Sequence, residues 1–233
     1  MLLSMIRSGN VNIIEVIVYI ISSLMVIFLV MPLHEWAHGF VANKLGDRTA
    51  KLQGRLTLNP LAHIDYLGAA MILLIGFGWA KPVPVDPRFF KKPKRDMALT
   101  ALAGPVSNLL AAIVSGLVFN LIVTILIKTN AYYSIEGSAM LYVLSFFYYL
   151  MMINVSLAVF NFIPIPPLDG SKILMAFLPY KAIFWIEKNQ NIITMVFMIA
   201  VIMGGVSDII YPVQKWLCNG IDWLTALPFS WAW

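Results

Sequence analysis

Long apolar runs separated by polar segments dominate this chain of 233 residues. A membrane-spanning helix needs about 20 mostly apolar residues. Four stretches meet that length, at residues 13–43, 97–127, 138–163 and 191–210. The first has its most apolar part at 13–33, with Glu15 as its only charge, and the fourth is interrupted by Gly204-Gly205. The pattern predicts an all-α membrane protein with about four transmembrane helices, in one polytopic domain covering residues 1–233.

Two further segments are apolar or aromatic without the pattern of a spanning helix. The run 67–79 is too short to span and contains three glycines, which predicts a re-entrant or β-hairpin-like segment between the first and second helices. The C-terminal stretch 211–233 holds four tryptophans. Because Trp concentrates at membrane–water interfaces, this stretch is expected to lie along the outer interface as an aromatic belt.

Composition narrows the class of protein further. Hydrophobic residues make up 61% of the chain and charged residues 12%, with a mean hydropathy of +0.84. Soluble domains carry roughly 25% charged residues. These values exclude a disordered chain, a nucleic-acid-binding arm and an ordinary cytosolic enzyme. The single cysteine, Cys218, excludes a disulfide scaffold.

The distribution of positive charge predicts the topology. Ten of the sixteen Lys and Arg residues lie between Lys44 and Arg95, and three more are Lys172, Lys181 and Lys188. The positive-inside rule places these segments in the cytoplasm and both termini outside. The run 91–95 is a solvated flank that is attracted to anionic lipid. The chain is thus expected to be a multi-pass protein of a bacterial or archaeal cell membrane, with the lipid bilayer and no nucleic acid as a partner.

The most informative residues follow the first apolar run, in the sequence His34-Glu35-Trp36-Ala37-His38. Residues four apart on a helix share a face, so both imidazoles can reach one metal ion. Glu35 is placed beside the ion without having to bind it, where a general base for a metal-activated water is needed. Histidines and an acid at the end of a membrane helix are costly to bury, which favours a functional interpretation.

A catalytic zinc needs a third protein ligand and an open position. Two candidates are His63, in a basic loop, and Asp169, which follows Pro164, Pro166 and Pro167. Three prolines within four positions cannot continue a helix, so the third helix is expected to unwind beside Asp169. Spacing favours Asp169 only slightly, since carboxylate and imidazole both suit zinc.

At this point the chain resembles the site-2 protease class of intramembrane zinc metalloproteases, peptidase family M50, in a compact form without PDZ or CBS domains. Three blocks carry the resemblance: HEWAH at 34–38, AGPVSN at 103–108, and NFIPIPPLDG at 161–170. It implies one Zn²⁺ per chain bound by His34, His38 and Asp169, with Glu35 as the catalytic acid/base. It also implies transmembrane proteins or peptides as substrates. The distribution of basic residues predicts that the active site lies toward the cytoplasmic side.

Several polar residues have candidate secondary roles. Asn161 and Asn108 are amides at membrane depth that can stabilise an oxyanion. Interhelical hydrogen bonding is favoured for Asn108, and the functional role for Asn161, which is near the break before Asp169. His63 can orient substrate or a ligand, or make a structural hydrogen bond. The segment 77–85, with two prolines, can present a strand edge to an extended substrate or form a plain interfacial loop.

Two other functions remain open at this level. A membrane metal-binding or transport protein without protease activity also places His and Asp in the membrane, but does not need Glu35. A membrane metalloenzyme that acts on prenylated peptides or lipids can use the same histidine pattern, but does not predict the proline-rich block before Asp169. The sequence predicts no oligomeric state.

Overall fold

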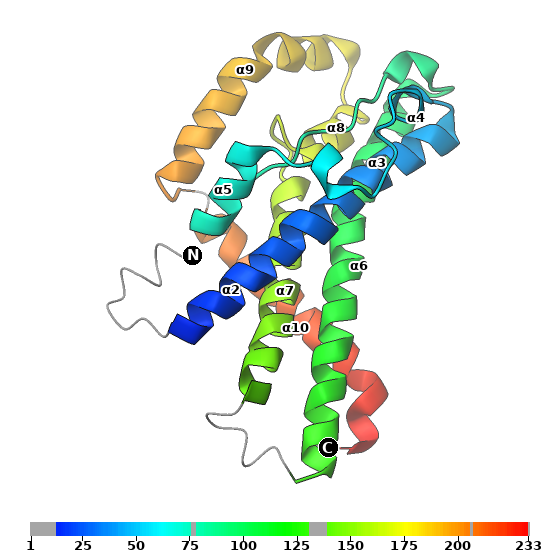
Figure 1. Cartoon of the computed structure of the whole chain (residues 1–233). Coiled ribbons are helices and arrows are strands. Elements are labelled where there is room, and N and C mark those ends of the chain that lie inside the picture. The colour runs from blue at the N-terminus through cyan, green and yellow to red at the C-terminus, as the bar shows by residue number, and fades with distance from the viewer. Residues whose placement is uncertain (1–12, 76–77, 131–138, 206, 233) are drawn as a thin grey trace.

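The computed structural model describes residues 13–75, 78–130, 139–205 and 207–232, and within them the chain is helical or irregular with no β-strand (Figure 1). The expected all-α architecture is therefore confirmed for the described residues. The N-terminal flank, residues 76–77 of the short apolar run, and residues 131–138 before the third predicted helix lie outside them. So does Trp233, the last residue of the predicted aromatic belt.

The first predicted span is one continuous helical rod. It consists of α2 (Ile13–Met25), a π-helical turn (Val26–Val30) and α3 (Met31–Leu45). Pro32 has no N–H and cannot bond the carbonyl four residues earlier, so the preceding turn widens. In that turn the Met31 N–H bonds the Val26 carbonyl, five residues back. The rod ends at Gly46, whose φ of 119° forms the left-handed cap typical of glycine.

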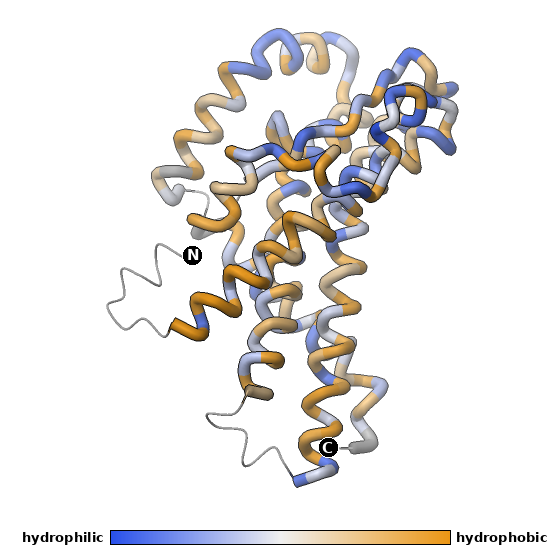
Figure 2. Tube along the Cα trace, in the orientation of Figure 1, coloured by the Kyte–Doolittle hydropathy of each residue, from blue (hydrophilic) through white to orange (hydrophobic). Residues whose placement is uncertain are grey.

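Two long helices form the centre of the bundle beside this rod. They are α6 (Pro93–Lys128) and α7 (Ala139–Phe162). The carboxylate of Asp96 accepts the N–H of Lys92 and so caps the start of α6. Residues 13–45, 93–128 and 139–162 are the described helices that are long and apolar enough to cross a membrane. Figure 2 shows their apolar stretches together, with the polar loops gathered at one end.

The core is built where these helices meet. Tyr19 and Val26 of the first rod pack on Leu150 and Ile153 of α7. On the other side of α7, Val155 packs with Ala112 of α6 and with the C-terminal helix α10 (Ser207–Ala226). α7 is thus packed between the first rod and α10, and the site described below lies at the end of this core.

The fourth predicted span, 191–210, differs from what the structure shows. The helix in this region, α9 (Tyr180–Ile202), begins earlier and includes Lys181, Glu187 and Lys188, and it is not among the described helices apolar enough to span. It ends before Gly204, which has a φ of 81°. Only Phe197 of its described side chains is buried, and α9 stands apart from the bundle along most of its length (Figure 1).

Short elements connect the long helices. They are α4 (Thr49–Leu52), α5 (Tyr66–Ile75), α8 (Asp169–Met175) and three 3₁₀ turns (Pro60–Ala62, Pro87–Phe89 and Leu227–Ala232). The segment predicted as re-entrant or β-hairpin-like contains α5 and extended backbone but no hairpin among its described residues. α5 lies against α2, where the Tyr19 hydroxyl donates to the Ile72 carbonyl at 3.1 Å.

The C-terminal helix α10 packs lengthwise on the bundle. Its inner face buries Cys218, Ile221 and Thr225, and the side chain of Asn120 on α6 donates to the Thr225 hydroxyl at 3.0 Å. Trp216 and Trp223 are exposed on its outer face. An interfacial position in the membrane for 211–233 stays a prediction.

Candidate functional site

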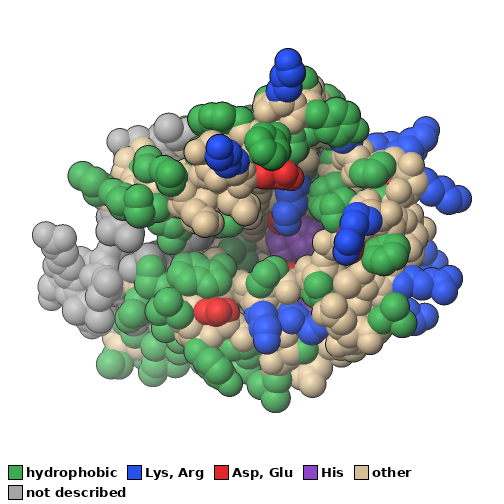
Figure 3. All heavy atoms as spheres, turned by 90° about the horizontal axis from the view of Figure 1, so that it is seen from above, with side chains coloured by type: hydrophobic (Ala, Val, Ile, Leu, Met, Phe, Trp, Pro, Cys, Tyr) green, Lys and Arg blue, Asp and Glu red, His purple; other side chains and the backbone are tan. Residues whose placement is uncertain are grey.

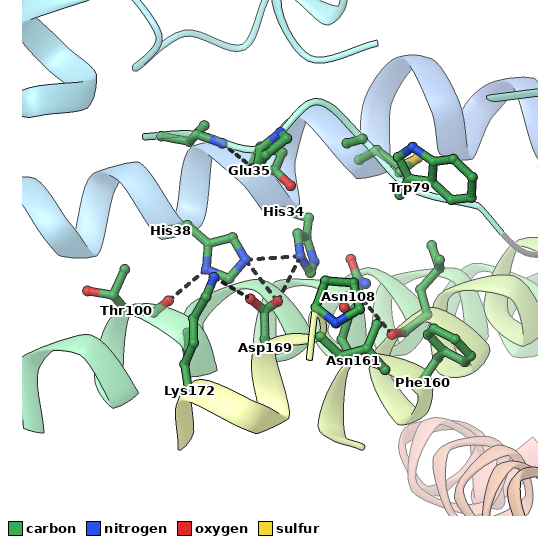
Figure 4. A pocket seen from close by; sticks show the side chains of 18 of the residues that line it. His34, Glu35, His38, Trp79, Thr100, Asn108, Phe160, Asn161, Asp169 and Lys172 are labelled. Carbon is green, nitrogen blue, oxygen red and sulfur yellow. Dashed lines mark hydrogen bonds and ion pairs between the residues drawn. The ribbon is translucent and has the colours of Figure 1, made fainter. Parts of the chain in front are cut away.

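The last turns of the first helical rod present His34 and His38 on one buried face. The two residues are four apart on α3, and their Nε2 atoms lie 3.0 Å from each other. Figure 4 shows both rings directed toward Asp169, with Glu35 on the other side of them. The i, i+4 spacing therefore produces the paired imidazoles that the sequence predicts.

A glycine on α6 leaves the space that the two imidazole rings occupy. A Cβ added at Gly104 would overlap Nε2 of His38 and would lie 2.5 Å from Cε1 of His34. No larger residue fits there without moving a ring. Gly104 is therefore needed for the close approach of α6 to the imidazoles.

Asp169 enters the cluster from the first turn of α8, directly after the proline-rich break. Its Oδ2 lies 3.3 Å from Nε2 of His34 and 3.1 Å from Nε2 of His38. The next residue, Gly170, packs against the end of α7, because a Cβ there would overlap the Phe162 carbonyl oxygen. The chain can thus turn back tightly at this point and place the carboxylate under the two rings.

His34, His38 and Asp169 form a group whose ligand atoms all lie within 4.8 Å of one another, so they can hold one metal ion. A tetrahedral zinc ion with ligands at about 2.0–2.2 Å places pairs of ligand atoms about 3.3 Å apart. The three measured separations, 3.0–3.3 Å, are close to this spacing. The donor set of two imidazoles and one carboxylate also matches known catalytic zinc sites.

Neighbouring groups orient two of the three side chains. Nδ1 of His38 lies 2.7 Å from the Thr100 carbonyl oxygen, which fixes Nδ1 as the protonated nitrogen and leaves Nε2 free to bind a metal. Nζ of Lys172 lies 3.5 Å from Oδ1 of Asp169, the oxygen that does not face the histidines. Nδ1 of His34 has no hydrogen-bond partner among the described residues.

The electrostatic surroundings keep Asp169 ionised. Burial of its carboxyl group raises the pKa, but the nearby His38, hydrogen bonds from both imidazoles and the charge of Lys172 outweigh burial. The net result is a pKa well below the usual value for Asp. The carboxylate is therefore in the form that binds a cation.

Glu35 is buried next to this cluster and has one well-defined partner. The backbone N–H of Val83 donates to its Oε2 at 2.8 Å. Val83 belongs to the extended segment 78–86, which we call the strap. The strap crosses α3 on the side of Glu35 (Figure 4).

The strap is fixed to the protein at several points. The Lys81 N–H donates to the His63 carbonyl at 2.8 Å, and Nη2 of Arg55 donates to the carbonyls of Lys81 and Pro82 at 2.9 and 3.1 Å. The buried Val83 side chain lies against Gly39, where a Cβ would come within 3.2 Å of it. Loop contacts thus hold a backbone N–H against the buried acid.

The strap, α3 and the segment before α8 enclose a cavity of about 280 Å³. It is lined by His34, Glu35, His38 and Asp169, by Trp79 and Val83 of the strap, and by Phe197 of α9. Seen from the polar end of the bundle, a histidine is visible at the bottom of a hollow, with basic side chains around it (Figure 3). The cavity therefore opens toward the polar end of the molecule.

Of the three residues with predicted secondary roles, two line the cavity and one does not. Asn108 is buried and Asn161 half-buried, and both line the cavity. Nδ2 of Asn161 donates to the Leu157 carbonyl in its own helix, while Oδ1 of Asn108 has no partner among the described residues. His63 does not line the cavity, and its Nε2 lies 2.7 Å from the Thr57 carbonyl oxygen. His63 is therefore not grouped with the metal-binding side chains.

Comparison with known proteins agrees with this arrangement. The sequence profile described as "Peptidase family M50" matches residues 22–204, which include the histidine pair, Glu35 and Asp169. The chain belongs to peptidase family M50. The resemblance to the site-2 protease class is thus confirmed at the level of the family, and the chain is a membrane protein of that family. Its described residues include three helices long and apolar enough to cross a membrane.

Two named relatives are similar to this M50 chain. YwhC of Bacillus subtilis (strain 168), named as a candidate zinc metalloprotease, is 44% identical over 166 residues, which cover 69% of each protein. Rip2 of Mycolicibacterium smegmatis (strain ATCC 700084 / mc(2)155), named in the same way, is 30% identical over 143 residues, which cover 59% of this chain and 50% of Rip2. No solved structure matches the chain.

Several features of the M50 site leave little or no signal in the sequence. The carbonyl of Thr100 and the N–H of Val83 are backbone groups, which leave no mark on residue identity. The close approach at Gly104 is visible only as part of a small-residue block. In the sequence, Lys172 serves only as one of the basic residues that predict the topology. Its position three residues after Asp169 on a helix is a signal that could identify it as a partner of Asp169.

Proposed function

We propose that this M50 protein is a zinc-dependent intramembrane protease, which hydrolyses peptide bonds in or near the transmembrane segments of membrane proteins. The observation that carries the proposal is the convergence of His34, His38 and Asp169 on one point, beside the buried carboxylate of Glu35. The family match and the names of the two relatives support both proteolysis and zinc.

The three ligands are assigned by their geometry and chemistry. His34 and His38 would bind one zinc ion through Nε2, and Asp169 through Oδ2. When bound, zinc supplies the positive charge that brings the pKa of a water molecule toward neutrality. Thr100 keeps His38 in the correct tautomer, and Lys172 pairs with the second oxygen of Asp169.

Glu35 is proposed as the acid/base. Its Oε2 accepts the Val83 N–H, which leaves Oε1 as the oxygen that can take a proton from the attacking water. The same carboxyl group then gives that proton to the amine that leaves. Asn108 and Asn161 line the cavity, and an amide of either can stabilise the developing oxyanion.

The strap is proposed to position Glu35. Residues 81–84 have no free backbone N–H group. Residues 82 and 84 are prolines, the Lys81 N–H donates to the His63 carbonyl, and the Val83 N–H donates to Glu35. An extended substrate can therefore pair with this stretch only through its own N–H groups and the carbonyls of the strap. This supports a role in holding the base over a role as a regular strand edge.

Water and substrate are proposed to reach the site from the cytoplasmic side. The basic segments lie at the same end of the bundle as the hollow that exposes a histidine (Figure 3). A helical substrate hides its carbonyls in its own hydrogen bonds, so a segment must become extended before it is cleaved. This orientation corresponds to a multi-pass protein of a bacterial or archaeal membrane.

The decisive experiment separates metal binding from proteolysis. Wild type, Glu35→Gln and Asp169→Ala are purified in lipid nanodiscs and tested for zinc content and for cleavage of a panel of transmembrane peptides. Glu35→Gln is expected to keep zinc and to lose roughly 10²–10⁴-fold in turnover, whereas Asp169→Ala loses zinc and activity together.

Two results would contradict the proposal. Full cleavage by Glu35→Gln would remove Glu35 as the acid/base. Zinc binding by wild type without cleavage of any peptide, together with zinc movement across the membrane, would favour the alternative of a metal-binding or transport protein.

A further inference from the structure

Four basic side chains line a second hollow, outside the cavity described above. Lys44 comes from the last turn of α3, Arg48 from the following loop, Lys91 from the segment just before α6, and Arg95 from the first turn of α6. The hollow, which we call the basic hollow, has a volume of about 580 Å³. Its one acidic lining residue in the described part of the chain is Asp96, which pairs with Arg95 at 2.7 Å. Arg48 and Lys91 have no ion-pair partner among the described residues.

Two buried carboxylates fix the backbone that carries these charges. Asp47 accepts the N–H groups of Thr49 and Asp86, at 2.9 and 2.7 Å. Asp96 accepts the N–H of Lys92 at 3.0 Å. Because both acids are almost completely buried, the loops on either side of the basic hollow are held in place before any ligand arrives.

The basic hollow lies at the ends of two helices that are long and apolar enough to cross a membrane. One candidate span ends at Leu45 and another begins at Pro93, which puts the four cations beside the polar end of both helices. Apolar side chains continue below them. The ring of Phe40 is exposed and lies 5.5 Å from Nζ of Lys44, and Leu99 is exposed one turn after Arg95. The cations match the phosphate group of a phospholipid, and the exposed apolar surface beside them matches its acyl chains.

We propose that the basic hollow binds the phosphate group of an anionic phospholipid, with the acyl chains along Phe40 and Leu99. Arg48 can donate two parallel hydrogen bonds to phosphate oxygens, and Lys44 and Lys91 supply point charges. Basic pockets between membrane helices are known to bind such headgroups. A free phosphate would satisfy the same cations, but it would make no use of the exposed apolar surface beside them.

A lipid in this position joins the end of α3 to the start of α6. These are the two helices whose contact places Nδ1 of His38 against the Thr100 carbonyl. Lipid binding would therefore stabilise the helix pair on which the proposed zinc site is built, whether or not the protein is a protease.

The test compares two variants with the same loss of charge. Full-length protein is placed in nanodiscs of phosphatidylcholine, with or without phosphatidylglycerol. The variant Arg48→Gln/Lys91→Gln removes two cations of the basic hollow, and the control Lys181→Gln/Lys188→Gln removes two exposed lysines of α9. Thermal unfolding and native mass spectrometry measure the stabilisation and the number of retained phosphatidylglycerol molecules.

Wild type and the control are expected to gain several degrees in Tm with phosphatidylglycerol and to retain one lipid, since basic side chains near a membrane attract anionic headgroups. Arg48→Gln/Lys91→Gln should lose that gain and retain the lipid at least about tenfold less often. Its Tm in phosphatidylcholine alone, compared with wild type, checks that it folds. If it does not fold, Lys91→Gln alone is used.

Three results would overturn the proposal. Equal loss in both variants would mean general charge attraction to the membrane surface. The absence of any effect of phosphatidylglycerol on wild type would mean that the basic hollow binds no such lipid. Equal stabilisation by glycerol 3-phosphate or inorganic phosphate in phosphatidylcholine nanodiscs would assign the site to free phosphates.

Discussion

The three side chains that can hold a metal ion and Glu35 are neighbours in the bundle, yet they are held in different ways. His34, His38 and Asp169 lie between packed helices, where Gly104 and Gly170 leave no spare room. Among the described residues, Glu35 accepts a hydrogen bond from a backbone N–H of the strap. The strap is irregular and is held by loop contacts. One half of the site is therefore built into the bundle, and the other half depends on a segment outside it.

Because of this difference, the metal-binding geometry and the position of Glu35 can be disturbed separately. Packed helices cannot shift without a loss of stability, so the metal-binding geometry should be coupled to the free energy of unfolding. Irregular segments open at a lower cost, so the position of the acid/base can change while the fold stays intact. Substitutions around the two halves should accordingly give different combinations of stability, zinc content and turnover.

Among substitutions that keep Glu35 and the three candidate ligands, the largest effect is expected for Gly104→Ala. The new methyl group would overlap Nε2 of His38, and the ring must move away. We expect zinc to bind about 10–100-fold more weakly and the free energy of unfolding to fall by about 1–3 kcal/mol. Chelator competition and thermal unfolding in nanodiscs measure the two changes.

The control for this substitution is Gly220→Ala. Gly220 lies in α10, and a methyl group added there would meet no neighbouring side chain or helix of the described residues within 4 Å. This variant should keep wild-type zinc affinity and gain slightly in stability from the better helix former. If Gly104→Ala behaves in the same way, the packed half of the site is more adaptable than its contacts indicate.

The packed half is also the part that the sequence predicts best. The i, i+4 spacing of His34 and His38 is a local property of one helix, and it predicts their pairing without knowledge of the fold. The third ligand is harder, because Asp169 is far along the chain and only the fold brings it, and not His63, beside the two histidines. The spacing of residues therefore leaves both candidates open.

The other half depends on features that do not appear in residue identity. The strap acts through the N–H of Val83, which any residue except proline provides. The fourth predicted span, 191–210, also differs in its bounds from α9. The apolar run that predicts a span does not show that α9 begins at Tyr180 and includes the charged residues Lys181, Glu187 and Lys188. It also does not show that the chain turns at Gly204. Tertiary contacts decide the position of the strap, whereas Pro179 and Gly204 mark the ends of α9 locally.

A smaller effect is expected for Arg55→Gln, which weakens the support of the strap. Arg55 donates to two strap carbonyls from a partly exposed position, so its loss should cost the strap about 1 kcal/mol. Turnover should fall by about three- to tenfold, with zinc affinity unchanged. Cleavage assays and chelator competition on the same preparation test this combination.

Arg88→Gln is the matched control, because Arg88 lies two residues after the strap and its described partner is Asp86, the last strap residue, whose backbone N–H is also bound by Asp47. It should turn over like wild type. A rise in turnover for Arg55→Gln would show that the strap obstructs Glu35, and a loss of zinc would show that the two halves of the site are not separate.

The smallest effect is expected for Lys172, which belongs to the metal-binding half but is partly exposed. Its ammonium group lies 3.5 Å from Oδ1 of Asp169 and leaves Oδ2 to the histidine side. Lys172→Met removes this restraint on the carboxylate, and zinc should bind about two- to tenfold more weakly, with thermal stability almost unchanged. Lys172→Arg keeps the charge and should restore most of the affinity. If Met and Arg weaken zinc binding equally, the charge of Lys172 does not orient Asp169, and the packing of α8 alone positions the third ligand.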